Sequence, residues 1–142
     1  GNLVTPSDWR YLWLNESFAT FFGFGVVDDY HPEWGIWEQF IGSQTEGALV
    51  RDGLHETFAI EIPGGEHVVI NTSTAPIIYS KGGSILRQVL GFIGPELFRE
   101  GLHRYLETHA YGNAASRQLW EAFESSSEKP VTRMNALVGD EL

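Results

Sequence analysis

The stretch YLWLNESFATFFGFGVV, from Tyr11 to Val27, decides the fold, because it places one carboxylate inside a run that otherwise looks like packed core. The carboxylate belongs to Glu16. Apolar residues at helical spacing form a stripe through the same stretch: Leu14, Phe18, Phe22 and Val26. We therefore predict a long helix from Tyr11 to about Tyr30, which ends at His31-Pro32.

Glu16 begins a second stripe, whose following members are all small: Ala19, Thr20 and Gly23. Small side chains beside a carboxylate let another backbone or a ligand come close, so Glu16 would face a groove. The alternative is that these residues form a tight helix-helix contact and that Glu16 caps its solvent end. The stripe alone leaves both readings open.

Composition indicates one soluble domain with a sizeable core. The 142 residues include nine basic and nineteen acidic residues, and the net charge of −10 argues against nucleic acid or an anionic membrane as partner. An acidic surface suits a cationic ligand such as a peptide amino terminus, although solubility explains the charge equally well. The chain contains no cysteine, and no apolar run approaches a membrane span. The default expectation is a cytoplasmic protein.

Outside the first stretch the pattern is again helical, so the predicted fold is a mainly α domain over residues 1–142, with five to six helices. The further helices are expected from Pro32 to about Val50, from Thr74 to Gly94, from Pro95 to before Gly112, from Ser116 to Ser125, and after Pro130. Residues 51–74 are predicted to form one long irregular loop, with a possible short strand at Val68–Ile70. Thr74 is the candidate cap of the helix that follows this loop.

The second informative stretch is IIYSKGGSIL, from Ile77 to Leu86. It places Tyr79 on one helix face with Gly82 and Gly83. A glycine inside a helix costs about 1 kcal/mol relative to alanine, so a close approach of another group should offset it. A phenol beside such a gap could donate a hydrogen bond to a developing oxyanion. The alternative is a buried core tyrosine above a close helix crossing.

Histidine and serine motifs give no separate catalytic site. The five histidines are scattered, no two lie four residues apart as in a helical zinc motif, and no G-x-S-x-G elbow is present.

At Glu16 and Tyr79 the chain resembles the gluzincin-type zinc aminopeptidases, the family of the aminopeptidase N, leukotriene hydrolase and tricorn-interacting factor type. The resemblance is carried in order by GNLVT, LWLNESFAT, the Pro32-Glu33-Trp34 turn, YSKGG and FREGLHRYLETHAYGNA. In that family H-E-x-x-H precedes the third ligand by eighteen residues, of which three come before GNLVT. Fifteen residues precede Glu16 here, so the sequence is expected to begin just after that motif.

The resemblance implies that Glu16 is the third zinc ligand and that Tyr79 stabilises the tetrahedral intermediate. Asn15, Lys81 and Gly82 would have supporting roles. The parent protein would be a zinc metallo-aminopeptidase that removes N-terminal residues from peptides. This chain would be the helical C-terminal lobe of its thermolysin-like catalytic domain.

Both histidine ligands and the general-base glutamate lie upstream in the family. The chain alone is therefore expected to bind no zinc and to be inactive, with the missing N-terminal lobe as its partner. Self-association through exposed apolar surface, or disorder near the N-terminus and in the 51–74 loop, would follow.

Two other functions remain open at this point. One is a non-catalytic helical module that holds a peptide or partner helix in the groove between Glu16 and Tyr79. The other is a helical scaffold in which these two residues only satisfy each other.

Overall fold

The computed structural model describes residues 3–61 and 69–136, with side chains up to residue 133. Within these ranges the chain is mainly helical, which confirms the predicted fold class. The elements, in order, are β1 (Val4–Pro6), a 3-10 turn at Trp9–Tyr11, α1 (Leu12–Tyr30), a 3-10 turn at Pro32–Trp34, α2 (Ile36–Phe40), a π-helix at Ile41–Thr45, α3 (Glu46–Asp52), a π-helix at Pro76–Lys81, α4 (Gly82–Ile93), α5 (Pro95–Thr108), β2 (Gly112–Ala114), α6 (Ser116–Ser127) and α7 (Val131–Ala136).

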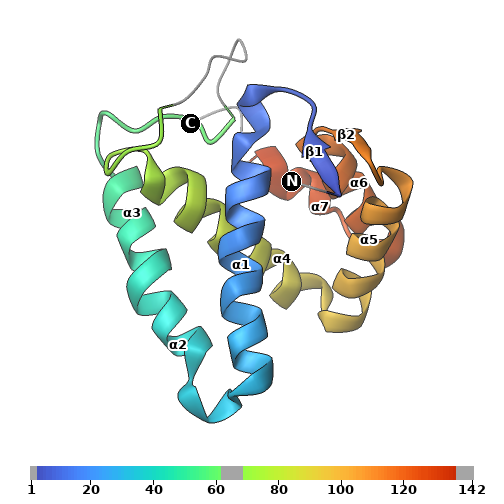
Figure 1. Cartoon of the computed structure of the whole chain (residues 1–142), viewed down its shortest axis with the longest axis horizontal. Coiled ribbons are helices and arrows are strands. Elements are labelled where there is room, and N and C mark those ends of the chain that lie inside the picture. The colour runs from blue at the N-terminus through green and yellow to red at the C-terminus, as the bar shows by residue number, and fades with distance from the viewer. Residues whose placement is uncertain (1–2, 62–68, 137–142) are drawn as a thin grey trace.

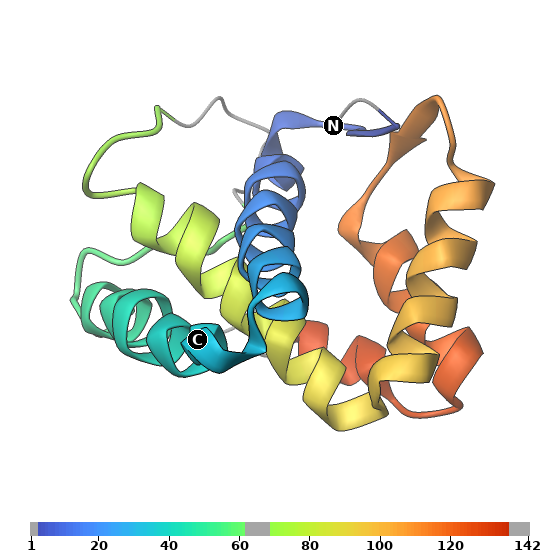
Figure 2. The same cartoon turned by 60° about the horizontal axis from the view of Figure 1, so that its bottom comes forward.

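Helix α1 stands in the centre of the molecule and crosses α4 (Figure 1). On one side lie residues 36–52, which we call the α2–α3 flank. On the other lie residues 95–136, the α5–α7 flank. Figure 2 shows the same two flanks on either side of α1 after rotation. Because α1 borders both flanks, its two faces have different surroundings.

The crossing of α1 and α4 depends on two glycines. A Cβ placed on Gly82 would overlap Ser17 Oγ and lie 2.7 Å from Ser17 Cβ, while one placed on Gly83 would lie 3.3 Å from Thr20 Cγ2. The close helix crossing that the sequence left open is therefore present. It offsets the cost of placing two glycines in a helix.

The buried face of α1 differs from the predicted apolar stripe. It consists of Trp13, Leu14, Ser17 and Phe21. Of the predicted stripe, Leu14 is buried, but Phe22 is 39% exposed and Val26 is 53% exposed. The physical reason is that residues spaced by four advance about 40° around a helix at each step, so a long series of them leaves the core face.

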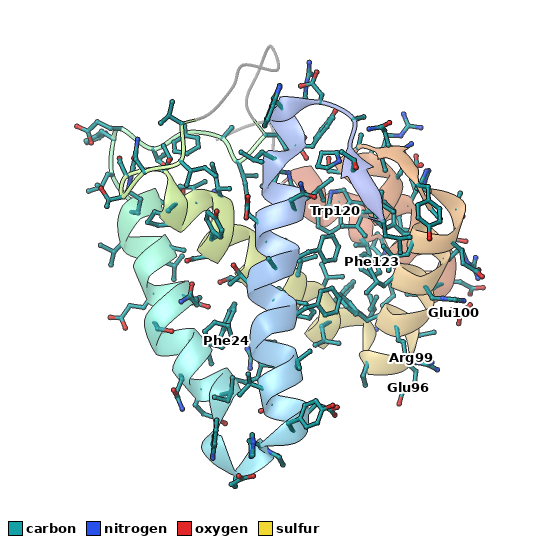
Figure 3. The ribbon with its side chains drawn as sticks, in the orientation of Figure 1. Phe24, Glu96, Arg99, Glu100, Trp120 and Phe123 are labelled. Atoms are coloured by element: carbon teal, nitrogen blue, oxygen red, sulfur yellow. The ribbon has the colours of Figure 1, made fainter. Side chains whose placement is uncertain are left out.

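Aromatic packing joins α1 to the α5–α7 flank. Trp13 stacks on Trp120 with ring centroids 5.9 Å apart, and Phe98 stacks on Phe123 at 4.7 Å. In Figure 3 Trp120 and Phe123 lie on this side of α1, and Phe24 lies on the opposite side, toward α2. The core is therefore concentrated on one side of the central helix.

The predicted helix from Pro32 to Val50 is interrupted. Gly35 has a φ of +58°, a left-handed conformation that favours glycine, and separates the 3-10 turn from α2. The Ile41–Thr45 π-helix then interrupts the regular pattern before α3. Hydrophobic spacing does not distinguish a π-turn from an α-turn, so this second interruption could not be predicted from the sequence.

The long loop contains no helix or strand in its described parts, residues 53–61 and 69–74, apart from turns. Val68 of the suggested strand lies outside the described residues, and Val69 and Ile70 are not in a strand. The side chain of Asn71 accepts hydrogen bonds from the backbone N–H groups of Ser73 and Thr74. Asn71 thus stabilises the turn before the helix, whereas Ala75, and not the predicted Thr74, is the N-cap and forms no side-chain cap hydrogen bond.

A short parallel strand pair was not predicted. Strand β1 pairs with β2 in the register Val4 to Gly112 and Pro6 to Ala114. The pair ties the entry of α1 to the connection between α5 and α6. Three-residue strands this far apart in sequence have no local pattern by which they could be recognised.

Candidate functional site

The structure brings Glu16 and Tyr79 together from separate elements, α1 and the Pro76–Lys81 π-helix. Burial raises the pKa of the Tyr79 phenol, and a hydrogen bond with the Glu16 carboxylate and the negative charge of that carboxylate raise it further. Both side chains are half-buried. The phenol therefore stays protonated at neutral pH and acts as a hydrogen-bond donor.

A cavity of about 400 Å³ lies beside this pair. The small residues that follow Glu16 on α1 form part of its wall, and Tyr79 contributes the phenol. The full lining consists of Ala19, Thr20, Gly23, Phe24, Val27, Ile36, Gln44 and Tyr79. A Cβ on Gly23 would meet no atom within 4 Å, so the small stripe does border open space as the sequence indicated.

Polar contacts join the Ile41–Thr45 π-helix, whose Gln44 lines the cavity, to the Pro76–Lys81 π-helix and the start of α4. Ser80 Oγ donates to Gln44 Oε1 at 2.7 Å, and Ser84 Oγ donates to the Ser80 carbonyl at 2.8 Å. Thr45 Oγ1 lies 2.9 Å from Ser84 Oγ and can donate to it. π-Turns occur frequently at functional sites. The sequence analysis missed Gln44 and Ser80, because nothing local marks a pairing of two distant π-turns.

Ser17 is a further residue near the site that the sequence did not single out. It is fully buried, and its Oγ donates to the backbone carbonyl of Ile78 at 2.7 Å. Ser17 follows Glu16 and Ile78 precedes Tyr79, so this hydrogen bond joins the two segments that carry the site. Its position directly after Glu16 was the one feature of the sequence that could have marked Ser17 as part of the site.

The other predicted site residues have contacts outside the cavity. Lys81 Nζ forms a salt bridge with Asp52 Oδ2 at 2.8 Å. Burial raises the pKa of Asp52, but hydrogen bonds from Lys81 and Thr57 outweigh it and hold this pKa below its usual value. Gly82 lies against Ser17 in the helix crossing. Lys81 and Gly82 therefore hold the Pro76–Lys81 π-helix in place through contacts that do not line the cavity.

Asn15 lies at a different place. It borders a second, mainly apolar cavity of about 290 Å³ between β1, α1 and α5, together with residues such as Phe18 and Tyr105. Successive helix residues are about 100° apart, so Asn15 and Glu16 face different regions.

The described residues fit a zinc site only in part. Among residues 3–61 and 69–133, no three His, Cys, Asp or Glu side chains are close enough to hold a metal ion together. A catalytic zinc site needs three protein ligands, and Glu16 could contribute one carboxylate.

None of the helices in the described ranges combines the length and apolarity needed to cross a bilayer.

Comparison with known proteins gives a consistent result. The chain matches the peptidase family M1 domain over residues 1–137. It is 46% identical to tricorn protease-interacting factor F2 of Thermoplasma volcanium, over 94% of this chain and 17% of that protein. It is 42% identical to aminopeptidase M1 of Arabidopsis thaliana, over 94% of this chain and 15% of that protein.

Probable aminopeptidase 2 of Sulfurisphaera tokodaii is also 42% identical, over 94% of this chain and 17% of that protein. The chain thus spans only a small part of the length of these relatives. The resemblance seen at Glu16 and Tyr79 is confirmed over nearly all of the sequence: the chain belongs to peptidase family M1.

Proposed function

We propose that this chain is part of a zinc-dependent aminopeptidase that hydrolyses N-terminal residues from peptides. The observation that carries the proposal is that Tyr79 lines an open cavity and lies near enough to Glu16 for the charge of that carboxylate to raise the pKa of the phenol. Family membership and the aminopeptidase names of several relatives support the same reaction.

In this proposal Glu16 is a metal ligand. A bound zinc would polarise the scissile carbonyl and lower the pKa of the attacking water. The described residues supply one of the ligands and do not form a complete metal site by themselves. Lys81 and Gly82 act indirectly, by holding the Pro76–Lys81 π-helix against α3 and α1, and Asn15 has a supporting role on α1 next to Glu16.

Tyr79 would stabilise the negative charge that develops on the carbonyl oxygen. Its raised pKa keeps the proton on the phenol, and the phenol can turn from Glu16 toward the cavity to donate a hydrogen bond to that oxygen. A donor already placed at the cavity wall needs little reorganisation during the reaction.

The remaining ligands and the general base would come from another lobe of the same protein. The small-residue face of α1 offers a surface where such a lobe could approach closely, since Ala19 and Gly23 are exposed and line the cavity. This supports a thermolysin-like catalytic domain of which the chain forms the helical lobe. The chain alone is then expected to be inactive and without bound zinc. Its cytoplasmic location and its self-association stay predictions.

A chimera tests the proposal. The chain replaces the matching segment of Arabidopsis aminopeptidase M1, and zinc content and hydrolysis of an aminoacyl chromogenic substrate are measured for the chimera and for the isolated chain. We expect activity only in the chimera. Glu16→Gln should lower its zinc content and reduce activity at least about 100-fold, because a ligand is removed.

Glu96→Gln is the matched control, since Glu96 is exposed in the first turn of α5. It should leave the activity of the chimera unchanged. A Glu16→Gln chimera as active as the Glu96→Gln chimera would contradict the proposal.

A non-catalytic peptide-binding module is the second candidate. The cavity beside Tyr79 favours it, because an open space with a mainly apolar lining can take a peptide side chain without a metal. If this function is correct, the isolated chain should bind peptides, and Gly23→Leu, which fills the cavity, should abolish that binding.

A further inference from the structure

Ser17 occupies a singular position between the two residues of the proposed site. Its side chain is fully buried, and its Oγ lies 2.7 Å from the carbonyl oxygen of Ile78. One residue before Ser17 is Glu16, and one residue after Ile78 is Tyr79. The hydrogen bond therefore joins the backbone segments on which both functional side chains are mounted.

This contact fixes the register of the two helices. Gly82 lies one turn after Ile78, at the start of α4. Because it has no Cβ, α4 can pack directly on Ser17; a Cβ there would overlap Ser17 Oγ. A shift of one helix by a single residue moves its atoms about 1.5 Å along the axis, which is enough to break a 2.7 Å hydrogen bond. The bond is thus compatible with one alignment of α1 and the π-helix.

The same arrangement occurs once more, in the α5–α7 flank. Ser126 Oγ on α6 lies 3.0 Å from the carbonyl oxygen of Leu97, and a Cβ on Gly101, four residues after Leu97, would lie 2.7 Å from that Oγ. Ser126 Oγ also lies 3.1 Å from the carbonyl oxygen of its own helix at Phe123. This second contact is remote from Glu16 and Tyr79, and so it provides a natural control.

We infer that Ser17 is a positioning residue, whose hydrogen bond to the Ile78 carbonyl sets the separation between the Glu16 carboxylate and the Tyr79 phenol. The inference rests on the proposed function for its catalytic meaning, but the placement it describes exists in the isolated chain as well. Ser17 touches neither substrate nor metal in this account. It acts through the two residues beside its hydrogen bond.

The first test compares Ser17→Ala with Ser126→Ala in the chimera described above. Each variant removes one hydroxyl and leaves a backbone carbonyl without that donor, so both should lower Tm, Ser126→Ala by the smaller amount because Ser126 is only half-buried. We expect Ser17→Ala to reduce kcat about tenfold with little change in KM, because misplacement affects the transition state. Ser126→Ala should leave kcat within about twofold of the parent.

A Tyr79→Phe background separates positioning from general loss of structure. If Ser17 acts by placing the phenol, Ser17→Ala should reduce kcat much less once the phenol hydroxyl is absent. Equal effects of Ser17→Ala in both backgrounds, or equal kcat values for Ser17→Ala and Ser126→Ala, would overturn the inference.

A second readout does not depend on activity. In the isolated chain, NMR should show magnetisation transfer between the Tyr79 ring and the Ala19 and Thr20 methyl groups that line the same cavity. This transfer should weaken in Ser17→Ala and persist in Ser126→Ala. An inactive parent chimera would refute the proposed function, whereas unchanged transfer in Ser17→Ala would refute the positioning role of Ser17.

Discussion

The two flanks of α1 pack against this helix through different kinds of side chains. Toward the α5–α7 flank, α1 presents Trp13 and Phe21 to packed aromatic rings, and the cavity beside them is smaller, about 290 Å³, and mainly apolar. Toward the α2–α3 flank, it presents Thr20 and Gly23 to a cavity bordered by two π-helices and hydroxyl contacts. The comparison indicates that one flank supplies stability and the other leaves room for chemistry.

The largest expected difference between the flanks concerns two phenylalanines. Phe123 is fully buried against Trp120 and Phe98, and Phe123→Ala should lower the free energy of unfolding by about 3–5 kcal/mol. Phe24 borders the cavity and packs on Phe40, so Phe24→Ala should cost only about 1–2 kcal/mol. Urea unfolding at neutral pH measures both. Similar losses would remove the distinction between the flanks.

The next effect concerns the helix crossing that joins them. Gly82→Ala places a methyl group on the buried Ser17 side chain and should destabilise the fold by about 2–3 kcal/mol. Gly91→Ala, in the same helix, meets no atom within 4 Å and should stabilise it by up to about 1 kcal/mol. Thermal unfolding of both variants checks this. A neutral Gly82→Ala would mean that the crossing is looser than described.

Alkaline pH should lower the stability of the α5–α7 flank through Tyr105. Burial raises the pKa of this phenol to about 12, above its value of about 10 in the unfolded chain. The stabilisation is complete below pH 10 and is lost as pH rises through 12, so about 1 kcal/mol should be lost by pH 11. Tyr105→Phe should remove this part of the pH dependence, as measured by urea unfolding at pH 9 and 11. The same alkaline loss in the variant would assign it to other groups.

Acid should lower the stability of the α2–α3 flank through Asp52, and this is the smallest of the expected changes. The folded pKa of Asp52 lies below its unfolded value, so its contribution is present above about pH 4 and is lost as pH falls through the folded pKa. Asp52→Asn should cost at most about 1 kcal/mol at pH 7 because the Lys81 pair is only partly buried, and the cost should shrink below pH 4. Unfolding curves at pH 7 and pH 3 test this. A cost that is equal at both pH values would contradict the prediction.

Much of the fold could be predicted from local pattern. The long helix around Glu16, the helices that begin at Pro95 and Ser116, and the irregular connection at residues 53–61 and 69–74 follow from periodicity and from proline and glycine positions. Arg51 and Asp52, which were predicted to lie in that loop, belong to α3. The π-helices and the β1–β2 pair could not be predicted, because both depend on contacts between residues far apart in sequence.

For the candidate site, the sequence by itself singled out the candidate residues, since Glu16 within an apolar run and Tyr79 before two glycines are local anomalies. Only the tertiary structure decided how they are placed: Ser17 donates a hydrogen bond to Ile78, Gly82 allows the helices to cross closely, and Tyr79 lines a cavity near Glu16. The reason is physical. Residue type and spacing specify the chemistry and helical face of a side chain, whereas the register between two helices is set by the side chains that interlock at their crossing.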